Sequence, residues 1–237
     1  IIKKIPIMIA NRTLLILFKY IVHVHFKILG SSSSGNAALL QAAGSSILID
    51  AGMSGKKLES LLHEEGLSAE ALDAVFLTHE HNDHSAGDGD FQNTEDFHFL
   101  PIKTQSKQSN PNNKEDKRKV FETGKPFSFG PFKIHPFSVP HDAYDPVGFF
   151  FEWGNGDLFD PTSSLAWVTD LGHVPTLVKE RIRQAKILVV EANHCSQMLE
   201  EDQKRPWSLK QRIRGRHGHL SNDSTFEMLQ SIEGSCW

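Results

Sequence analysis

The chain has 237 residues, of which 39% are hydrophobic and 23% are charged, and its formal net charge is −4. This length allows one large domain or two small ones, and the composition is that of an ordinary soluble globular protein. The net charge gives no global indication of nucleic-acid binding. The two cysteines, Cys195 and Cys236, exclude a disulfide framework and fit a reducing, cytoplasmic location, with a single bridge as the weaker alternative.

Residues 1–25 are expected to form an N-terminal extension outside the fold. Their lysine pair and apolar runs resemble a signal peptide, but Asn11, Arg12 and Lys19 interrupt the apolar character and no small-x-small cleavage site follows. No stretch of the chain reaches the roughly 18–20 unbroken apolar residues that a transmembrane helix needs. We therefore expect no membrane association and a single domain over residues 26–237.

The first half of this domain alternates strands and a helix. The pattern predicts a strand at 26–30, a small-residue loop at 31–36 and a hairpin at 38–50 that turns near Gly44-Ser45. It then predicts a helix within 53–67, between Ser54 and Gly66, and a buried strand at 74–78. Residues 88–119 are polar and predict a flexible surface loop.

The second half contains three strand-like runs followed by helices and one more buried strand. We expect strands at 131–139, 147–153, 165–169 and 187–193, and helices at 173–185, 207–215 and 222–233. Many strands with interspersed helices, and apolar runs that end in polar residues, indicate a layered α/β protein.

A dense set of metal-binding side chains follows the strand at 74–78. The segment His79-x-His81-x-Asp83-His84 offers imidazoles and a carboxylate without thiolate, which suits zinc, manganese or iron. Four ligands in six residues cannot converge on one ion without strain, so we expect two ions, about 3.5–4 Å apart. A solvated turn that happens to be rich in histidine is the weaker alternative.

Three other side chains share this placement at the end of a strand-like run. Asp50 follows Ile47-Leu48-Ile49, His141 follows the strand at 131–139, and Asp170 follows the strand at 165–169. Each alone is more often a turn residue. Together with the histidine-rich segment they predict a dinuclear metal site.

In chain order, Asp50, the His79–His84 segment, His141 and Asp170 resemble the first four motifs of the metallo-β-lactamase fold. Further stretches resemble the WalJ (YycJ/VicX) group of bacterial hydrolases, namely LGSSSSGN, LIDAGMSGKKLE, LTHEHNDH, VTDLGHV, EANH, RPWSLKQRIRG and GHLSND. The resemblance covers residues 26 to about 232. It implies an α/β fold, the αββα sandwich of the metallo-β-lactamase type.

The resemblance also implies a role for each of these residues. One metal ion would be bound by His79, His81 and His141, the second by Asp83 and His84, with Asp170 bridging both. Asp50 would hydrogen-bond the ligands and fix their geometry. The implied nucleophile is a metal-bound hydroxide, formed from water whose pKa zinc lowers to about 7, and Asp83 would orient it or accept its proton. Zinc is the expected metal, with manganese or iron as alternatives.

One feature departs from the family pattern. The family has a fifth motif, a histidine after one more strand, beyond the position where this chain stops, so the expected sandwich is C-terminally truncated and its second metal site incomplete. His219 in GHLSND resembles that motif superficially. We expect His219 to contact substrate, with a metal-binding or a loop role as alternatives.

A basic segment indicates the substrate. Residues 204–219 contain six Lys and Arg and no acidic residue, as expected of a phosphate-binding patch, although a solvated helix face explains them equally well. Lys210 and Arg212 would bind phosphates, and Trp207 would stack on a base. His194 would donate a proton to the leaving group, or else hydrogen-bond within the core.

The resemblance favours one activity among three. It implies a 5′-to-3′ exonuclease that hydrolyses phosphodiester bonds of double-stranded DNA, with nucleic acid as partner and no deducible protein partner. The alternatives are a small-molecule esterase, thioesterase or lactamase on the same fold, and an inactive truncated relic or regulatory binding protein.

Overall fold

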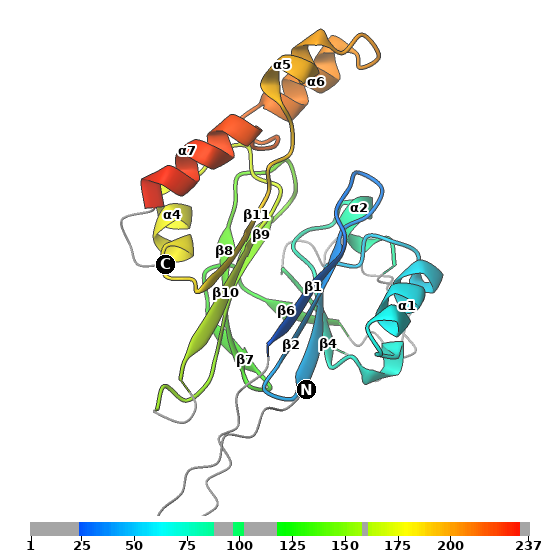
Figure 1. The fold of residues 1–237 in the computed structure, drawn as a ribbon, viewed down its shortest axis with the longest axis vertical. Helices are drawn as coiled ribbons and strands as arrows, with labels where there is room; N and C mark the ends of the chain where they lie inside the picture. The colour runs from blue at the N-terminus through cyan, green and yellow to red at the C-terminus, as the bar shows by residue number, and fades with distance from the viewer. Residues whose placement is uncertain (1–23, 88–96, 102–117, 158–160, 233–237) are drawn as a thin grey trace, which may run out of the picture.

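A computed structural model describes residues 24–87, 97–101, 118–157 and 161–232, which fold into two sheets that lie face to face with helices outside them (Figure 1). One sheet has six strands in the order β1-β2-β3-β4-β5-β6, and the other has five in the order β11-β10-β9-β8-β7. This arrangement confirms the predicted αββα sandwich.

The six-stranded sheet begins antiparallel and continues parallel. Its strands are β1 (His25–Gly30), β2 (Ala37–Ala42), β3 (Ser45–Ile49), β4 (Ala74–Phe76), β5 (Phe97–Pro101) and β6 (Arg118–Phe121). The β2–β3 hairpin turns at Ala43 and Gly44, whose φ angles of 50° and 84° are the left-handed values that a tight two-residue turn requires. From β3 to β6 every pairing is parallel.

The five-stranded sheet is antiparallel except at one edge. It consists of β7 (Phe127–Phe129), β8 (Phe132–Ser138), β9 (Val147–Trp153), β10 (Ser163–Val168) and β11 (Ile187–Val190). β8 and β10 are both antiparallel to β9, and β11 is parallel to β10. The C-terminal ends of β8, β10 and β11 therefore lie at the same end of the sheet.

The helices cover the outer faces of the sheets or extend beyond them (Figure 1). α1 (Gly55–Glu64) packs on the six-stranded sheet, followed by the short η1 (Ala69–Ala71), and α2 (Asn82–Ser85) follows β4. α4 (Thr176–Ile182) and α7 (Asn222–Ile232) pack on the five-stranded sheet. α5 (Ser196–Glu201) and α6 (Trp207–Arg214) form a helical hairpin that projects past the end of the sheets.

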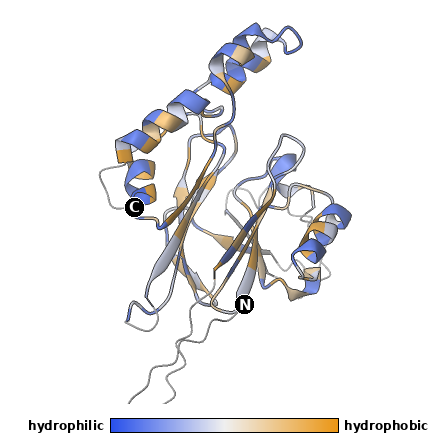
Figure 2. Cartoon of the chain, viewed as in Figure 1, coloured by the Kyte–Doolittle hydropathy of each residue, from blue (hydrophilic) through white to orange (hydrophobic). Residues whose placement is uncertain are grey.

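Three apolar layers hold the sandwich together. In β9, Phe149 and Phe151 point into the layer between the sheets, whereas Phe150 points outward into the layer beneath α4 and α7. In β3, Ile47 likewise belongs to the central layer and Leu48 to the layer beneath α1. A strand covered on both faces needs apolar residues at consecutive positions, which explains why these segments show unbroken hydrophobic runs (Figure 2).

The polar region 88–119 contains more structure than its composition predicts. Residues 97–101 and 118–121 form β5 and β6, so the prediction of a flexible loop is wrong for these parts, because pairing with β4 is a long-range contact that local composition does not encode. The predicted N-terminal extension is wrong at its last two residues, because His25 begins β1 and Val24 packs against the central apolar layer. Residues 1–23 and the remainder of the polar region lie outside the described residues, so the extension over residues 1–23 stays a prediction. In the part of the chain that the structure describes, no helix has the length and apolarity to cross a membrane.

Candidate metal centre

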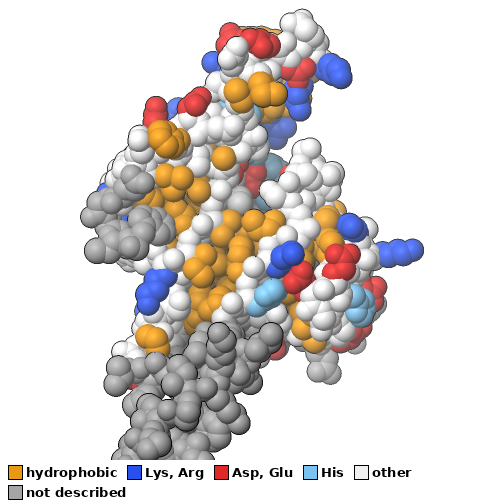
Figure 3. Space-filling model, viewed as in Figure 1, with side chains coloured by type: hydrophobic (Ala, Val, Ile, Leu, Met, Phe, Trp, Pro, Cys, Tyr) orange, Lys and Arg blue, Asp and Glu red, His pale blue; other side chains and the backbone are white. Residues whose placement is uncertain are grey.

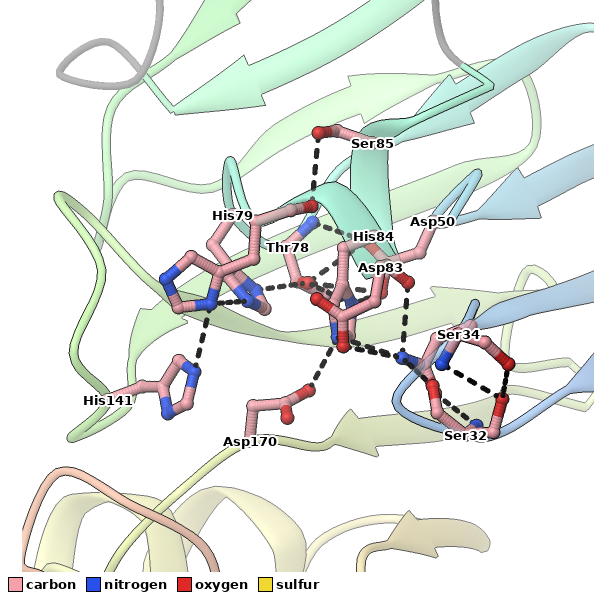
Figure 4. Close-up of polar contacts among 12 residues, drawn as sticks. Ser32, Ser34, Asp50, Thr78, His79, Asp83, His84, Ser85, His141 and Asp170 are labelled. Carbon is pink, nitrogen blue, oxygen red and sulfur yellow. Dashed lines mark hydrogen bonds and ion pairs between the residues drawn. The ribbon is translucent and has the colours of Figure 1, made fainter. Parts of the chain in front are cut away.

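The ends of three strands bring the predicted ligands together at one end of the sandwich (Figure 4). The loop after β4 and the start of α2 carry His79, His81 and His84 from the six-stranded sheet. His141 follows β8 and Asp170 follows β10, both from the five-stranded sheet. The site therefore spans the two sheets.

Three imidazoles converge on one point. The Nδ1 atom of His81 lies 3.1 Å from His79 Nε2 and 3.3 Å from His141 Nε2. His79 and His141 are buried, and burial is the main cause that lowers the pKa of each, in the case of His79 well below its usual value. Burial thus favours the neutral form of His79 and His141, which is the form in which an imidazole binds a cation.

His84 connects two buried or largely buried carboxylates. Its Nδ1 atom lies 2.9 Å from Asp50 Oδ2, and its Nε2 atom lies 3.0 Å from Asp170 Oδ2. Burial alone would lower the pKa of His84, but the carboxylates outweigh it and raise that pKa to about 11. For Asp170, burial is outweighed by the hydrogen bond and charge of His84, so its pKa is lowered.

Asp50 fixes the loop that carries the histidines. Its Oδ1 atom accepts hydrogen bonds from the backbone N–H of Thr78 at 2.8 Å and from the Thr78 hydroxyl at 2.9 Å. The same hydroxyl lies 2.9 Å from His79 Nδ1. Through these hydrogen bonds Asp50 would orient the candidate ligands, which is the role predicted for it. The part played by Thr78 was not foreseen, because a threonine at a strand end carries no distinctive sequence signal.

His219 lies against the same centre from the other side. Its Nδ1 atom lies 3.3 Å from Asp170 Oδ1 and 3.0 Å from Glu191 Oε2. Burial lowers the pKa of His219, but Glu191 outweighs it and the pKa is raised. Glu191, which carries no distinctive sequence signal, also accepts hydrogen bonds from the backbone N–H groups of Leu171 and Leu220, so it joins the end of β10 to the His219 segment.

Asp83 and His194, the predicted catalytic residues, lie beside the centre. The Asp83 carboxylate is 33% exposed, with Oδ2 3.7 Å from His84 Nε2. His194 forms an isolated β-bridge with Ser221, its buried Nδ1 atom has no hydrogen-bond partner, and burial is the main cause that lowers its pKa.

Asn36 is a neighbour of the centre that the sequence did not single out. Its Nδ2 atom lies 3.1 Å from the Asp83 carbonyl oxygen, to which it donates, and 3.1 Å from His84 Nε2. Its Oδ1 atom accepts a hydrogen bond from the Ser32 backbone N–H, which fixes the orientation of the amide. The small-residue loop at 31–36 therefore adjoins the site. The only sequence feature that could have indicated this contact is the asparagine that ends the loop.

Of the predicted substrate-binding residues on α6, two are exposed and one is buried. Trp207 is exposed on the projecting hairpin. Arg212 donates from Nε to Asp142 Oδ2 at 2.5 Å, next to His141 in the chain. Lys210 differs from the prediction of a phosphate contact, because it is buried and its Nζ donates to the Glu200 carbonyl oxygen at 2.7 Å, between the two helices.

The donor set fits divalent metal ions. Within the described part of the chain, three groups of side chains each place one ligand atom per residue within 4.8 Å of the others: His79, His81 and His141; His79, His84 and Asp170; and His141, Asp170 and His219. Imidazoles and carboxylates without thiolate are ligands for zinc, manganese or iron. A proton on His84 balances two carboxylates here, and a divalent cation would serve the same electrostatic purpose.

Comparison with known proteins agrees with this geometry. The family model described as "Beta-lactamase superfamily domain" matches residues 45–235, which is most of the chain. The chain belongs to the beta-lactamase superfamily.

Within this superfamily the chain is similar to two curated bacterial nucleases. It is 33% identical over 206 residues to "Exodeoxyribonuclease YycJ" of Bacillus anthracis, a match that covers 84% of this chain and 74% of the relative. It is 35% identical over 210 residues to "Exodeoxyribonuclease WalJ" of Streptococcus pneumoniae serotype 2, covering 86% of this chain and 75% of the relative. These matches confirm the resemblance to the WalJ group.

Solved structures of the superfamily share the fold. The metallo-beta-lactamase fold protein YhfI from Bacillus subtilis aligns with a TM-score of 0.62 at 18% identity, covering 88% of this chain and 81% of that chain. A diphosphatase from the PhnP family aligns with a TM-score of 0.58 at 17% identity, covering 86% and 72%. Family, fold and donor set together identify the chain as a metal-dependent hydrolase.

Proposed function

We propose that this chain is an exodeoxyribonuclease that hydrolyses phosphodiester bonds at a centre of two divalent metal ions. The observation that carries the proposal is the convergence of His79, His81, His84, His141 and Asp170 from both sheets at one edge of the sandwich. The nuclease names of the two bacterial relatives support DNA as the substrate. Duplex DNA as the preferred form, the 5′-to-3′ direction and zinc as the metal are parts of the same proposal.

The chain offers ligands for both ions. His79, His81 and His141 would hold the first, and His84 would hold the second together with Asp83. Asp170 is a member of two convergent groups, one with His84 and one with His141, which supports its role as the bridging ligand. The exposed and more distant position of Asp83 makes it the weakest ligand of this set.

Bound ions of this kind act as Lewis acids that activate water and neutralise the negative charge of a phosphodiester. The residues around them would orient the reactants. Asp83, on the exposed side of the centre, would hold the attacking water. His219, fixed by Glu191 through Nδ1, would present its other ring nitrogen to a phosphate oxygen of the substrate. A DNA substrate also fits the cytoplasmic location that we propose.

The test of this function is cleavage of end-labelled duplex DNA by the purified chain loaded with zinc, manganese or iron. His79→Ala removes a ligand from two convergent groups and is expected to lower the rate by at least about 100-fold, because positioned metal chemistry is lost. His63→Ala, an exposed histidine on α1, is the matched control and should leave the rate unchanged.

Two outcomes would overturn the proposal. One is a protein that binds two metal ions and cleaves no nucleic acid with any of the three metals. The other is hydrolysis of chromogenic esters or lactams at a rate that added DNA does not alter, which would assign the centre to a small-molecule hydrolase.

A further inference from the structure

The helical hairpin of α5 and α6 projects beside the metal centre. Lys210 is 7% exposed, and its Nζ atom bonds the Glu200 carbonyl oxygen at 2.7 Å, which joins the two helices. Arg212 joins the hairpin to the centre through its 2.5 Å contact with Asp142, the residue after His141. The first contact holds the two helices together, and the second holds α6 beside the centre.

The outer face of α6 carries an open hollow. It has a volume of about 390 Å³ and is lined by Trp207, Gln211 and Arg214. These residues are spaced four and then three positions apart, so they lie on one face of the helix. The Trp207 side chain is 59% exposed, although an indole ring is among the most favourable groups to bury.

The helix that carries the hollow lies in a basic segment. Residues 204–219 contain six Lys and Arg and no acidic residue, whereas α5 and the turn after it contribute Glu200, Glu201 and Asp202, and side chains of both signs are visible on the projecting hairpin (Figure 3). The Arg214 guanidinium lies 3.7 Å from Glu200 Oε2, a long and exposed contact that holds the group weakly. Arg214 can therefore turn toward an anion in the hollow.

The two ends of the hairpin also adjoin the metal centre. The segment between β11 and α5 contains His194, which forms a β-bridge with Ser221, and the segment after α6 contains His219, whose Nδ1 atom lies 3.3 Å from Asp170 Oδ1. Both ends of the hairpin are therefore held close to the centre.

We propose that Trp207, Gln211 and Arg214 form a nucleotide-binding subsite that holds one nucleotide of the DNA strand next to the cleaved linkage. Trp207 stacks on the base, Arg214 binds a phosphate and Gln211 hydrogen-bonds the edge of the base. This inference rests on the proposed function for the identity of the ligand. A protein partner fits less well, because the hollow combines a single aromatic ring with a guanidinium instead of a broad apolar patch.

The test is binding of a fluorescein-labelled 12-base-pair DNA duplex with phosphorothioate linkages, which resist cleavage, to the metal-loaded protein by fluorescence anisotropy. Trp207→Ala should raise Kd about tenfold, and Trp207→Phe, which keeps a stacking ring, should recover most of that loss. Arg214→Gln should reduce the slope of log Kd against log salt by about 1, because one phosphate contact is lost. Met198→Ala is the matched control, since Met198 is 72% exposed on the same hairpin and does not line the hollow.

Metal content and melting temperature of each variant establish that the fold and the centre are intact. A change of less than twofold in Kd for Trp207→Ala, or an equal loss for Met198→Ala, overturns the subsite. A wild-type chain that binds the duplex through Trp207 but cleaves no DNA overturns the proposed function and leaves the subsite standing. A wild-type chain that cleaves DNA, together with a Trp207→Ala variant that binds the duplex as tightly as the wild type, overturns the subsite and leaves the proposed function standing.

Discussion

Two aspartates at the centre adopt a backbone conformation that is unusual for residues other than glycine. Asp50 and Asp170 have φ angles of 61° and 54°; Asp50 directly follows β3, and Asp170 lies two residues after the end of β10. Aspartate tolerates this left-handed region better than most residues, but at a cost in conformational energy. This conformation turns the chain sharply, so that each carboxylate faces His84, and the contacts with His84 offset the cost.

The Asp50→Asn variant tests the role of this carboxylate. The substitution keeps the shape but removes the charge next to His84 Nδ1 and replaces an acceptor with a donor. We expect metal affinity to fall by about 10–100-fold, because a residue that orients a ligand is lost. The measurement is competition for zinc with a chromogenic chelator.

Asp73→Asn is the control for that experiment. Asp73 also accepts a backbone hydrogen bond, from Ser46 N–H at 2.7 Å, but at the opposite end of β3 from the centre. Equal metal affinity for Asp50→Asn and the wild type would show that Asp50 does not support the ligands.

At the scale of the element, β9 is the strand on which both apolar layers of the five-stranded sheet depend. Phe151 is fully buried between the sheets, where it contacts the rings of Phe76, Phe132 and Phe149. Phe151→Ala is expected to lower the free energy of unfolding by about 3–5 kcal/mol, because it leaves a cavity in the central layer.

Urea denaturation followed by circular dichroism would measure this loss. Phe226→Ala makes the same chemical change at a side chain that is 61% exposed on α7, and it should alter stability by less than about 0.5 kcal/mol. Similar losses at both positions would contradict the assignment of β9 to the core.

At the scale of the whole molecule, the centre joins the two sheets. His79, His81 and His84 come from the end of β4, whereas His141 and Asp170 come from the ends of β8 and β10. An ion bound by ligands from both sheets resists their separation. At a free metal concentration of 100 times Kd, each bound ion is expected to stabilise the folded protein by about 2.7 kcal/mol.

We therefore expect that a chelator lowers the melting temperature and that added zinc restores it. Differential scanning fluorimetry of the metal-loaded chain, with and without a chelator, would measure both. The His79→Ala variant should respond less to the chelator than the wild type. A melting temperature that is the same with and without metal would show that the ions do not link the sheets.

The sequence by itself determined the family, most of the strands and the principal candidate ligands. Unbroken apolar runs such as residues 147–153 require burial on both faces, and closely spaced histidines such as His79 and His81 have few other uses. Both signals are local in the chain, so they are legible without a structure.

The tertiary structure decided which side chains share an environment. Lys210 and Arg214 have the same sequence character, yet one is buried between helices and the other lines an open hollow, because helix packing selects the face that is covered. Glu191 and Asn36 reach the centre through contacts across 28 and 48 positions of the chain, with His219 and His84 respectively. Such contacts depend on the register of strands that pair over long distances, and no local pattern encodes that register.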